Sequence, residues 1–237
     1  MKLRNTVLIG AAVGMVAMIQ TAQAAFTDTL ADLVANNGSL SVGDKTFSGF
    51  SYLATDLTGF NASKIIVTAS QVGDNYFLTW GGKITLGSLG PASADLLLGY
   101  TVTAQPGKIV AIDQNYTGSA QNSVGLSAGT FLAVDENVYV PGSAVAIGHS
   151  HLSAFDLSDP FAEPGDILTI KPAQHILNVT KDIGFDIADP NGGFITISQI
   201  EQSFDQVPEP TTMIAGALLL LPFGASTLRI LRRNRMV

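Results

Sequence analysis

The chain has 237 residues, enough for one or two domains, and 46% of them are hydrophobic, so it can bury a core of its own. Between residues 25 and 206 it carries six lysines, no arginine and 18 acidic residues, a net charge of −12 that repels phosphate backbones and excludes nucleic acid as a partner. The absence of cysteine excludes disulfides, thiol nucleophiles and thiolate metal sites.

Residues 1–24 have the layout of a secretory signal peptide. Two basic residues lie near the start, a mainly apolar run covers residues 7–19, and Ala22-Gln23-Ala24 is a small-x-small cleavage site. The mature chain is therefore predicted to begin at Ala25, outside the cytoplasm. The alternative is an uncleaved membrane anchor, for which the apolar run is short.

Residues 27–38 predict one short helix. Thr27 or Asp28 can cap its start, leucines and a valine recur on one face, and Asn36-Asn37-Gly38 is a stop signal. So short a helix is not stable by itself, and its apolar face is expected to pack on the rest of the domain.

From Leu40 onward the pattern changes to strands and turns. Residues 95–104 alternate with a period of two, which predicts a strand with one buried face. Four further β-branched or aromatic runs and four turn signals follow the same pattern: residues 65–67, 76–78, 109–112 and 195–197, with Gly73-Asp74, Gly81-Gly82, Pro106-Gly107 and Asn191-Gly192-Gly193. Residues 25–206 are thus predicted to form one all-β domain, an antiparallel β-sandwich of the jelly-roll type.

Residues 207–237 form a tail of three parts. Val207-Pro208-Glu209-Pro210 cannot continue a helix, and residues 211–228 carry no charge. At about 1.5 Å per residue these 18 residues would span roughly 27 Å as a transmembrane helix, enough for a bilayer core. The basic end, residues 229–237, holds four arginines: Arg229, Arg232, Arg233 and Arg235. These stop-transfer charges place it in the cytoplasm, so the precursor is expected in the inner membrane with its body facing the periplasm.

The order of these three parts resembles the PEP-CTERM sorting signal. The resemblance rests on Pro208-Glu209-Pro210, the uncharged span and the terminal arginines, and it covers the last 31 residues. It implies a Gram-negative host that makes exopolysaccharide, and processing by exosortase, a membrane enzyme that reads the tail. It also implies delivery to the cell surface or the biofilm matrix.

Parts of the body also resemble other PEP-CTERM passengers. These are the run from Val42 to Tyr52, the tripeptide Lys181-Asp182-Ile183, and the strand-like Ile197-Ser198-Gln199-Ile200 before the tail. This second resemblance implies location and processing, and no particular chemistry.

His149 and His151 are candidates for a transition-metal site. Two residues apart, they would share one face of a strand, and Asp156, Asp159 or Glu163 could complete the ligand set. The same segment could instead be a turn with exposed histidines. The acidic loops could also bind calcium, although none has the spacing of an EF-hand.

Gly125-Leu126-Ser127-Ala128-Gly129 matches the G-x-S-x-G pattern of a hydrolase nucleophile. That motif requires a helix after the serine, whereas residues 130–134 are typical of a strand. We therefore predict no catalytic residue here, and no enzyme activity.

The primary hypothesis is a structural protein of the cell surface or the extracellular matrix. Its expected partners are exosortase and the secretion machinery, transiently the inner membrane, and exopolysaccharide. One alternative is a surface module that binds polysaccharide or calcium, the one cofactor considered. The other is a hydrolase or metal site around His149 and His151.

Overall fold

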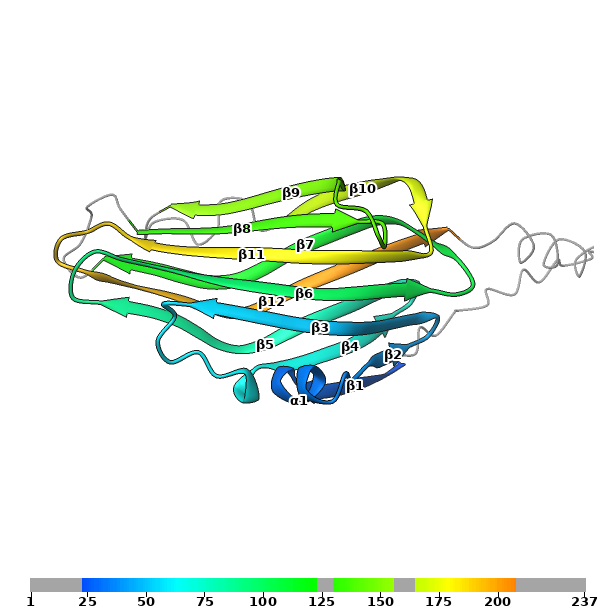
Figure 1. Cartoon of the computed structure of the whole chain (residues 1–237), viewed down its shortest axis with the longest axis horizontal. Coiled ribbons are helices and arrows are strands. Elements are labelled where there is room, and N and C mark those ends of the chain that lie inside the picture. The colour runs from blue at the N-terminus through cyan, green and yellow to red at the C-terminus, as the bar shows by residue number, and fades with distance from the viewer. Residues whose placement is uncertain (1–22, 123–129, 156–164, 208–237) are drawn as a thin grey trace, which may run out of the picture.

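The computed structural model describes residues 23–122, 130–155 and 165–207, and its strands form two facing six-stranded sheets (Figure 1). The first sheet contains, in spatial order, β1 (Gln23–Thr29), β4 (Ile66–Val72), β5 (Asn75–Ser88), β12 (Gly193–Val207), β7 (Lys108–Asn122) and β10 (Gly165–Gln174). The second contains β2 (Leu40–Val42), β3 (Lys45–Thr55), β6 (Ala92–Ala104), β11 (Ile176–Ile187), β8 (Thr130–Tyr139) and β9 (Ala146–Phe155). All pairings are antiparallel, which confirms the predicted all-β sandwich.

The eight strands from β5 to β12 fold back on one another as nested pairs. β5 pairs with β12, β6 with β11, β7 with β10, and β8 with β9. The chain thereby crosses repeatedly between the two sheets, in the arrangement of a jelly roll. β1 to β4 extend one edge of each sheet, and Figure 1 shows the helix lying beside β1 at that edge.

Strand alternation builds the core between the sheets. In β6, Leu96, Leu98 and Val102 are buried, whereas Asp95 and Leu97 lie on the outer face. The predicted alternation of residues 95–104 is therefore confirmed, and the same pattern recurs in β8, β11 and β12. Side chains from both sheets thus form one continuous apolar cluster.

The N-terminal helix is shorter than predicted and begins later. α1 covers Leu30–Ala35, and its N-cap is Thr29, whose hydroxyl accepts a hydrogen bond of 3.1 Å from the Asp32 amide. The predicted caps Thr27 and Asp28 are wrong, because residues 27–29 pair with β4 as part of β1. The apolar face packs as expected, with Leu30 and Leu33 buried.

The predicted turn at Gly81-Gly82 is also wrong, because both glycines lie inside β5. Opposite them the pairing with β12 shifts register, which marks a β-bulge. Gly82 has φ +138°, and a Cβ there would meet the Lys64 carbonyl oxygen at 2.6 Å. The glycine signal therefore reflects a bulge with a close backbone approach. The other three predicted turn signals do join consecutive strands.

The predicted transmembrane helix over residues 211–228 lies outside the described residues. Within residues 23–122, 130–155 and 165–207, no helix is long and apolar enough to cross a membrane.

A buried ion pair lies between the sheets. Lys181 of β11 and Glu136 of β8 both have fully buried side chains, and Nζ of Lys181 is 2.5 Å from Oε2 of Glu136. The same Nζ donates a hydrogen bond of 2.9 Å to Oε1 of Gln114, which projects from β7 of the facing sheet. The pair therefore connects the two layers of the sandwich.

Further polar side chains hold this pair in place. Gln202 of β12 donates its amide to Oε2 of Glu136 and accepts a hydrogen bond from the Tyr100 hydroxyl. The amide nitrogen of Gln114 donates a hydrogen bond of 2.5 Å to the hydroxyl of Ser150 on β9. Because buried polar groups are costly unless they are hydrogen-bonded, this network fixes how the six strands that carry it are aligned.

The aromatic packing in the core predicts a large cost for Phe204→Ala. Phe204 is fully buried, with its ring centroid 5.2 Å from that of Phe47 and 6.4 Å from that of Tyr100. Its removal is expected to lower the free energy of unfolding by about 3–5 kcal/mol. Denaturant unfolding would measure this. Phe194→Ala is the matched control, on the same strand but 37% exposed, and it should cost less than half as much. Equal losses would contradict the assigned inner and outer faces of β12.

Candidate functional site

The outer face of the second sheet carries a row of side chains along β8. Alternate positions of this strand face outward, because Leu132, Val134, Glu136 and Val138 are buried. The outward residues are Phe131, Ala133, Asp135, Asn137 and Tyr139, of which Ala133 is itself covered by its neighbours and buried. We call this set the β8 row.

His149 and His151 lie beside the β8 row on the neighbouring strand β9. Register places His151 opposite Asp135 and His149 opposite Asn137. Both imidazoles contact the same carboxylate oxygen, Oδ1 of Asp135, from Nδ1 of His151 at 2.8 Å and from Nε2 of His149 at 3.2 Å. The prediction that both histidines lie on one face of a strand is therefore confirmed, and the alternative of a turn is wrong.

Asp135 was missed in the sequence. The signal that could have found it is Pro141-Gly142, which joins β8 to β9 and predicts a hairpin. A hairpin would have brought residues near 135 and 151 together.

The predicted metal-ligand set is not assembled by the described residues. Asp156, Asp159 and Glu163 lie outside them. In the described part of the chain, no group of three or more histidines, aspartates and glutamates is placed to hold a metal ion. The two histidines and Asp135 instead form a hydrogen-bonded cluster at the surface.

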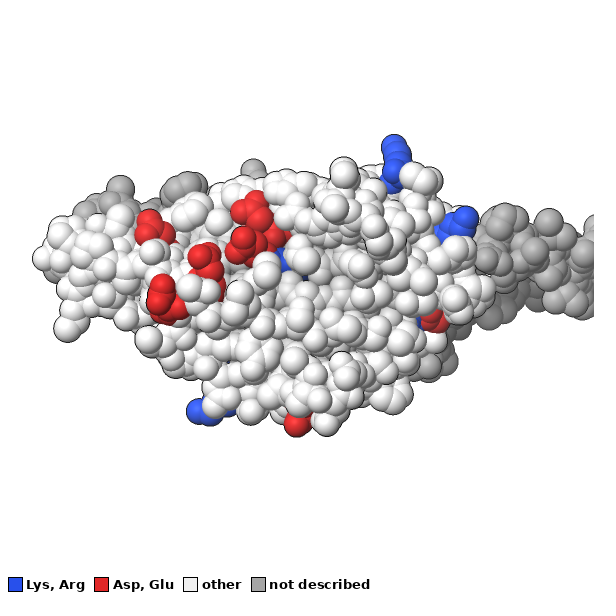
Figure 2. Space-filling view, in the orientation of Figure 1, with Lys and Arg blue, Asp and Glu red and all other residues white. Residues whose placement is uncertain are grey.

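Acidic side chains continue from Asp135 across the sheet. Asp182 of β11 lies opposite Asp135 in the register, and Asp95 of β6 and Asp186 of β11 lie nearby on the same face. Figure 2 shows acidic side chains gathered on this face. Burial raises the pKa of Asp182, and the charges of Asp95 and Asp135 raise it further. The face thus has a negative field and an excess of hydrogen-bond acceptors.

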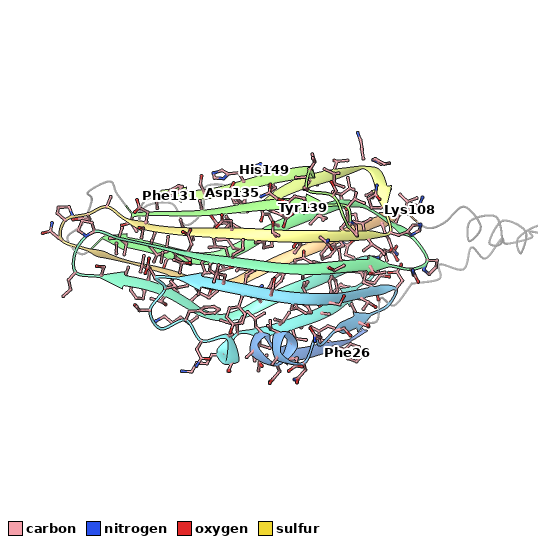
Figure 3. All side chains as sticks on the ribbon, viewed as in Figure 1. Phe26, Lys108, Phe131, Asp135, Tyr139 and His149 are labelled. Carbon is pink, nitrogen blue, oxygen red and sulfur yellow. The ribbon has the colours of Figure 1, made fainter. Side chains whose placement is uncertain are left out.

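Aromatic side chains mark both ends of the β8 row. Figure 3 shows Phe131, Asp135 and Tyr139 following one another along β8, with His149 beside Asp135. Phe131 and Tyr139 are both partly exposed. They are eight residue steps apart on the strand, roughly 27 Å at about 3.4 Å per residue. The distance between the two aromatic residues is therefore greater than the length of a ligand that consists of a single ring.

Most of the predicted processing residues lie outside the described residues. These are Ala22, Pro208, Glu209, Pro210, Arg229, Arg232, Arg233 and Arg235. The G-x-S-x-G segment at residues 125–129, which was considered as a hydrolase motif, also lies outside them. Ala24 and Ala25, at the predicted signal-cleavage site, lie in β1. Val207, the first residue of the predicted sorting motif, ends β12 and is exposed. The strand that was expected after residue 129 is confirmed as β8.

Comparison with known proteins finds likeness of structure only. No family model and no curated protein matches the chain. The solved structure of TmCBM61 with β-1,4-galactotriose is 10% identical, covers 65% of this chain and 87% of its own, and has a TM-score of 0.31. The family 11 carbohydrate-binding module from Clostridium thermocellum, with a β-1,3-1,4-mixed-linked tetrasaccharide, is 11% identical over 72% and 96% of the two chains, with a TM-score of 0.17. These scores are too low to transfer a site or a function to this chain.

The raised pKa of Asp182 predicts a pH-dependent effect of Asp182→Asn. The folded protein binds this proton at a higher pH than the unfolded chain does, so stability falls as pH rises through the folded value. The variant removes that loss, and near pH 7 its free energy of unfolding should exceed that of the wild type by less than about 1 kcal/mol. Near pH 3, where the group is protonated in both states, the two should agree.

Denaturant unfolding at both pH values, repeated in high salt, would check this. Salt should reduce the difference because Asp95 and Asp135 contribute through their charges. A difference of equal size at both pH values would contradict the assignment.

Proposed function

We propose that this chain is an exported, non-catalytic surface protein whose β-sandwich binds neutral polysaccharide across the outer face of the second sheet. The observation that carries the proposal is the β8 row, in which two aromatic rings flank an aspartate and an asparagine, with two histidines alongside. This row combines the two kinds of contact that a sugar chain needs.

The polar part of the row matches sugar hydroxyls. Each hydroxyl can donate and accept a hydrogen bond, whereas an ionised carboxylate only accepts and an amide or imidazole can do both. Asp135 is held between two imidazoles, so its carboxylate already has a defined position. A site that is fixed before binding loses less conformational entropy when a ligand binds.

The aromatic part of the row supplies apolar contact. Sugar rings have apolar C–H faces, which pack on the faces of aromatic side chains. Phe131 and Tyr139 are far enough apart for one extended chain to contact both while its hydroxyls meet the polar residues between them.

The charge of the face indicates a neutral ligand. Asp95, Asp135, Asp182 and Asp186 all lie on this face, and polymers of sugar acids would be repelled by them. Neutral glycans avoid this cost. An acidic polymer would need a bridging cation such as calcium, which makes added calcium a useful variable in the test.

The sequence signals supply the route. The signal peptide would export the chain, and the PEP-CTERM-like tail would hold it in the inner membrane until exosortase processes it. The acidic domain would then reach the cell surface or the exopolysaccharide matrix, where long neutral glycans are available.

Binding is expected to depend on Tyr139. Tyr139→Ala should weaken binding to a soluble neutral glucan or galactan about tenfold or more, the loss of roughly 1.4 kcal/mol expected for an aromatic contact. Affinity electrophoresis with the wild-type chain, in gels containing each polysaccharide, would measure it. Phe26→Ala is the control, because Phe26 is a 51% exposed aromatic residue on β1 of the other sheet.

Two results would overturn the proposal. One is that neither a neutral polysaccharide nor the host's own exopolysaccharide retards the wild-type chain in the gel. The other is that Tyr139→Ala and Phe26→Ala weaken binding equally. Binding only to acidic polymers with calcium would favour the calcium-binding alternative. Release of reducing sugars that is lost on replacing His149 and His151 would favour the hydrolase alternative.

Sorting is expected to depend on the Pro-Glu-Pro motif. In the native host, intact mass should show a mature species that begins at Ala25 and ends near Pro208–Pro210, outside the inner membrane. Replacing the three motif residues by alanine should leave the tail attached and the protein in the inner-membrane fraction. If the wild type itself retains residues 211–237 there, the chain is a permanently anchored ectodomain.

A further inference from the structure

The buried network contains the three groups needed to make an amide bond between side chains. Lys181 supplies an amine, Gln114 a carboxamide and Glu136 a carboxyl group. Nζ of Lys181 lies 2.9 Å from Oε1 of Gln114 and 2.5 Å from Oε2 of Glu136. All three residues are at most 2% exposed.

We propose that Lys181 and Gln114 become joined by an intramolecular amide bond. The bond would form within the folded domain without a separate enzyme, and Glu136 would carry the proton. This inference is independent of the proposed function. The bond would link β11 to β7, and therefore one sheet to the other, across 67 residues of sequence.

The reaction balances without an oxidant or a second reactant. The ammonium group of Lys181 passes a proton to Glu136, and the free amine attacks Cδ of Gln114. The Nζ–Cδ bond forms and the Cδ–Nε2 bond breaks. The two protons lost by the lysine nitrogen leave with the departing nitrogen as ammonium, and Glu136 is again a carboxylate.

The first step needs only one short proton transfer. Nζ of Lys181 lies 2.5 Å from Oε2 of Glu136, and both side chains are fully buried, so the proton moves along an existing hydrogen bond away from water. The lysine nitrogen then becomes a nucleophile rather than an ammonium ion. The hydrogen bond from Nζ to Oε1 holds the amine beside the carboxamide, and groups fixed next to each other react much faster than the same groups in solution.

The neighbouring side chains orient the reacting groups. The hydrogen bond from Gln114 to Ser150 turns the carboxamide so that its oxygen faces Lys181. Gln202 holds Oε2 of Glu136, and burial raises the pKa of Tyr100 well above its usual value, so its hydroxyl stays a donor to Gln202. The atom of Glu136 that receives the proton is therefore Oε2, which Lys181 contacts, while Oε1 has no hydrogen-bond partner among the described residues.

Lys45 provides an internal comparison. Its Nζ is 2.7 Å from Asp44 and donates to Gln206, a similar set of groups near the edge of the sandwich. There the Asp44 side chain is 15% exposed, and Nζ also lies 4.0 Å from the centroid of the Tyr76 ring. The Asp44 carboxylate is therefore in contact with water, unlike the fully buried Glu136, and we propose no bond at Lys45.

Peptide mapping of the full chain, purified from its host and fully denatured, would test the bond. A protease that cleaves after acidic residues should release residues 114–135 and 167–182 as one linked pair, lighter than the sum of the two peptides by one ammonia. Tandem mass spectrometry should place the link between Gln114 and Lys181. Lys45→Met should retain the linked pair.

Glu136→Gln should abolish the link and release the two peptides separately. If this variant does not fold, the wild-type map still decides the question. Recovery of both peptides unlinked from folded wild type would overturn the proposal. So would a pair lighter by one water and joined through Glu136. Tyr139→Ala should lose polysaccharide binding but keep the link between Lys181 and Gln114. The peptide map and the binding assay therefore test the two proposals separately.

Discussion

The arrangement of the sandwich depends on one electrostatic constraint, the burial of Lys181 and Glu136 between the sheets. Each charge alone would cost several kcal/mol in the interior, so the two must meet. They are directly opposite in the pairing of β11 with β8, and a slip of one residue would turn one of them to the outside. The Gln114 and Gln202 contacts extend the same requirement to β7 and β12 of the other sheet.

This register also builds the outer face. Asp135 precedes Glu136 and Asp182 follows Lys181 in the sequence. The buried pair of Glu136 and Lys181 is therefore adjacent to the pair of Asp135 and Asp182, which lie opposite each other on the outer face. Asp135 is then within reach of both histidines, and burial raises the pKa of Asp182, to which the nearby charges of Asp95 and Asp135 add. One alignment of two strands therefore sets both the polar centre of the core and the negative field of the candidate binding face.

Local pattern in the sequence predicted what depends on neighbouring residues. The alternation of residues 95–104 identified a strand and its buried face, and the composition of the body identified an all-β sandwich. The errors arose where pairing with a distant strand determines the secondary structure. Residues 27–29 join a sheet instead of a helix, and Gly81-Gly82 form a bulge opposite β12. The contact between Lys181 and Glu136, 45 residues apart, was not predicted, because nothing local marks them as partners.

The buried lysines also explain how so acidic a domain can be held together without disulfides. Two of the six lysines in the body, Lys45 and Lys181, are fully buried. Their contacts to Gln206 and Gln114 each run from the second sheet to the first. The cations thus act inside the sandwich, where they tie the sheets together, and leave the acids to dominate the surface. A rigid support of this kind under β8 keeps Asp135 and the flanking rings in place before a ligand arrives, which lowers the entropy that binding must overcome.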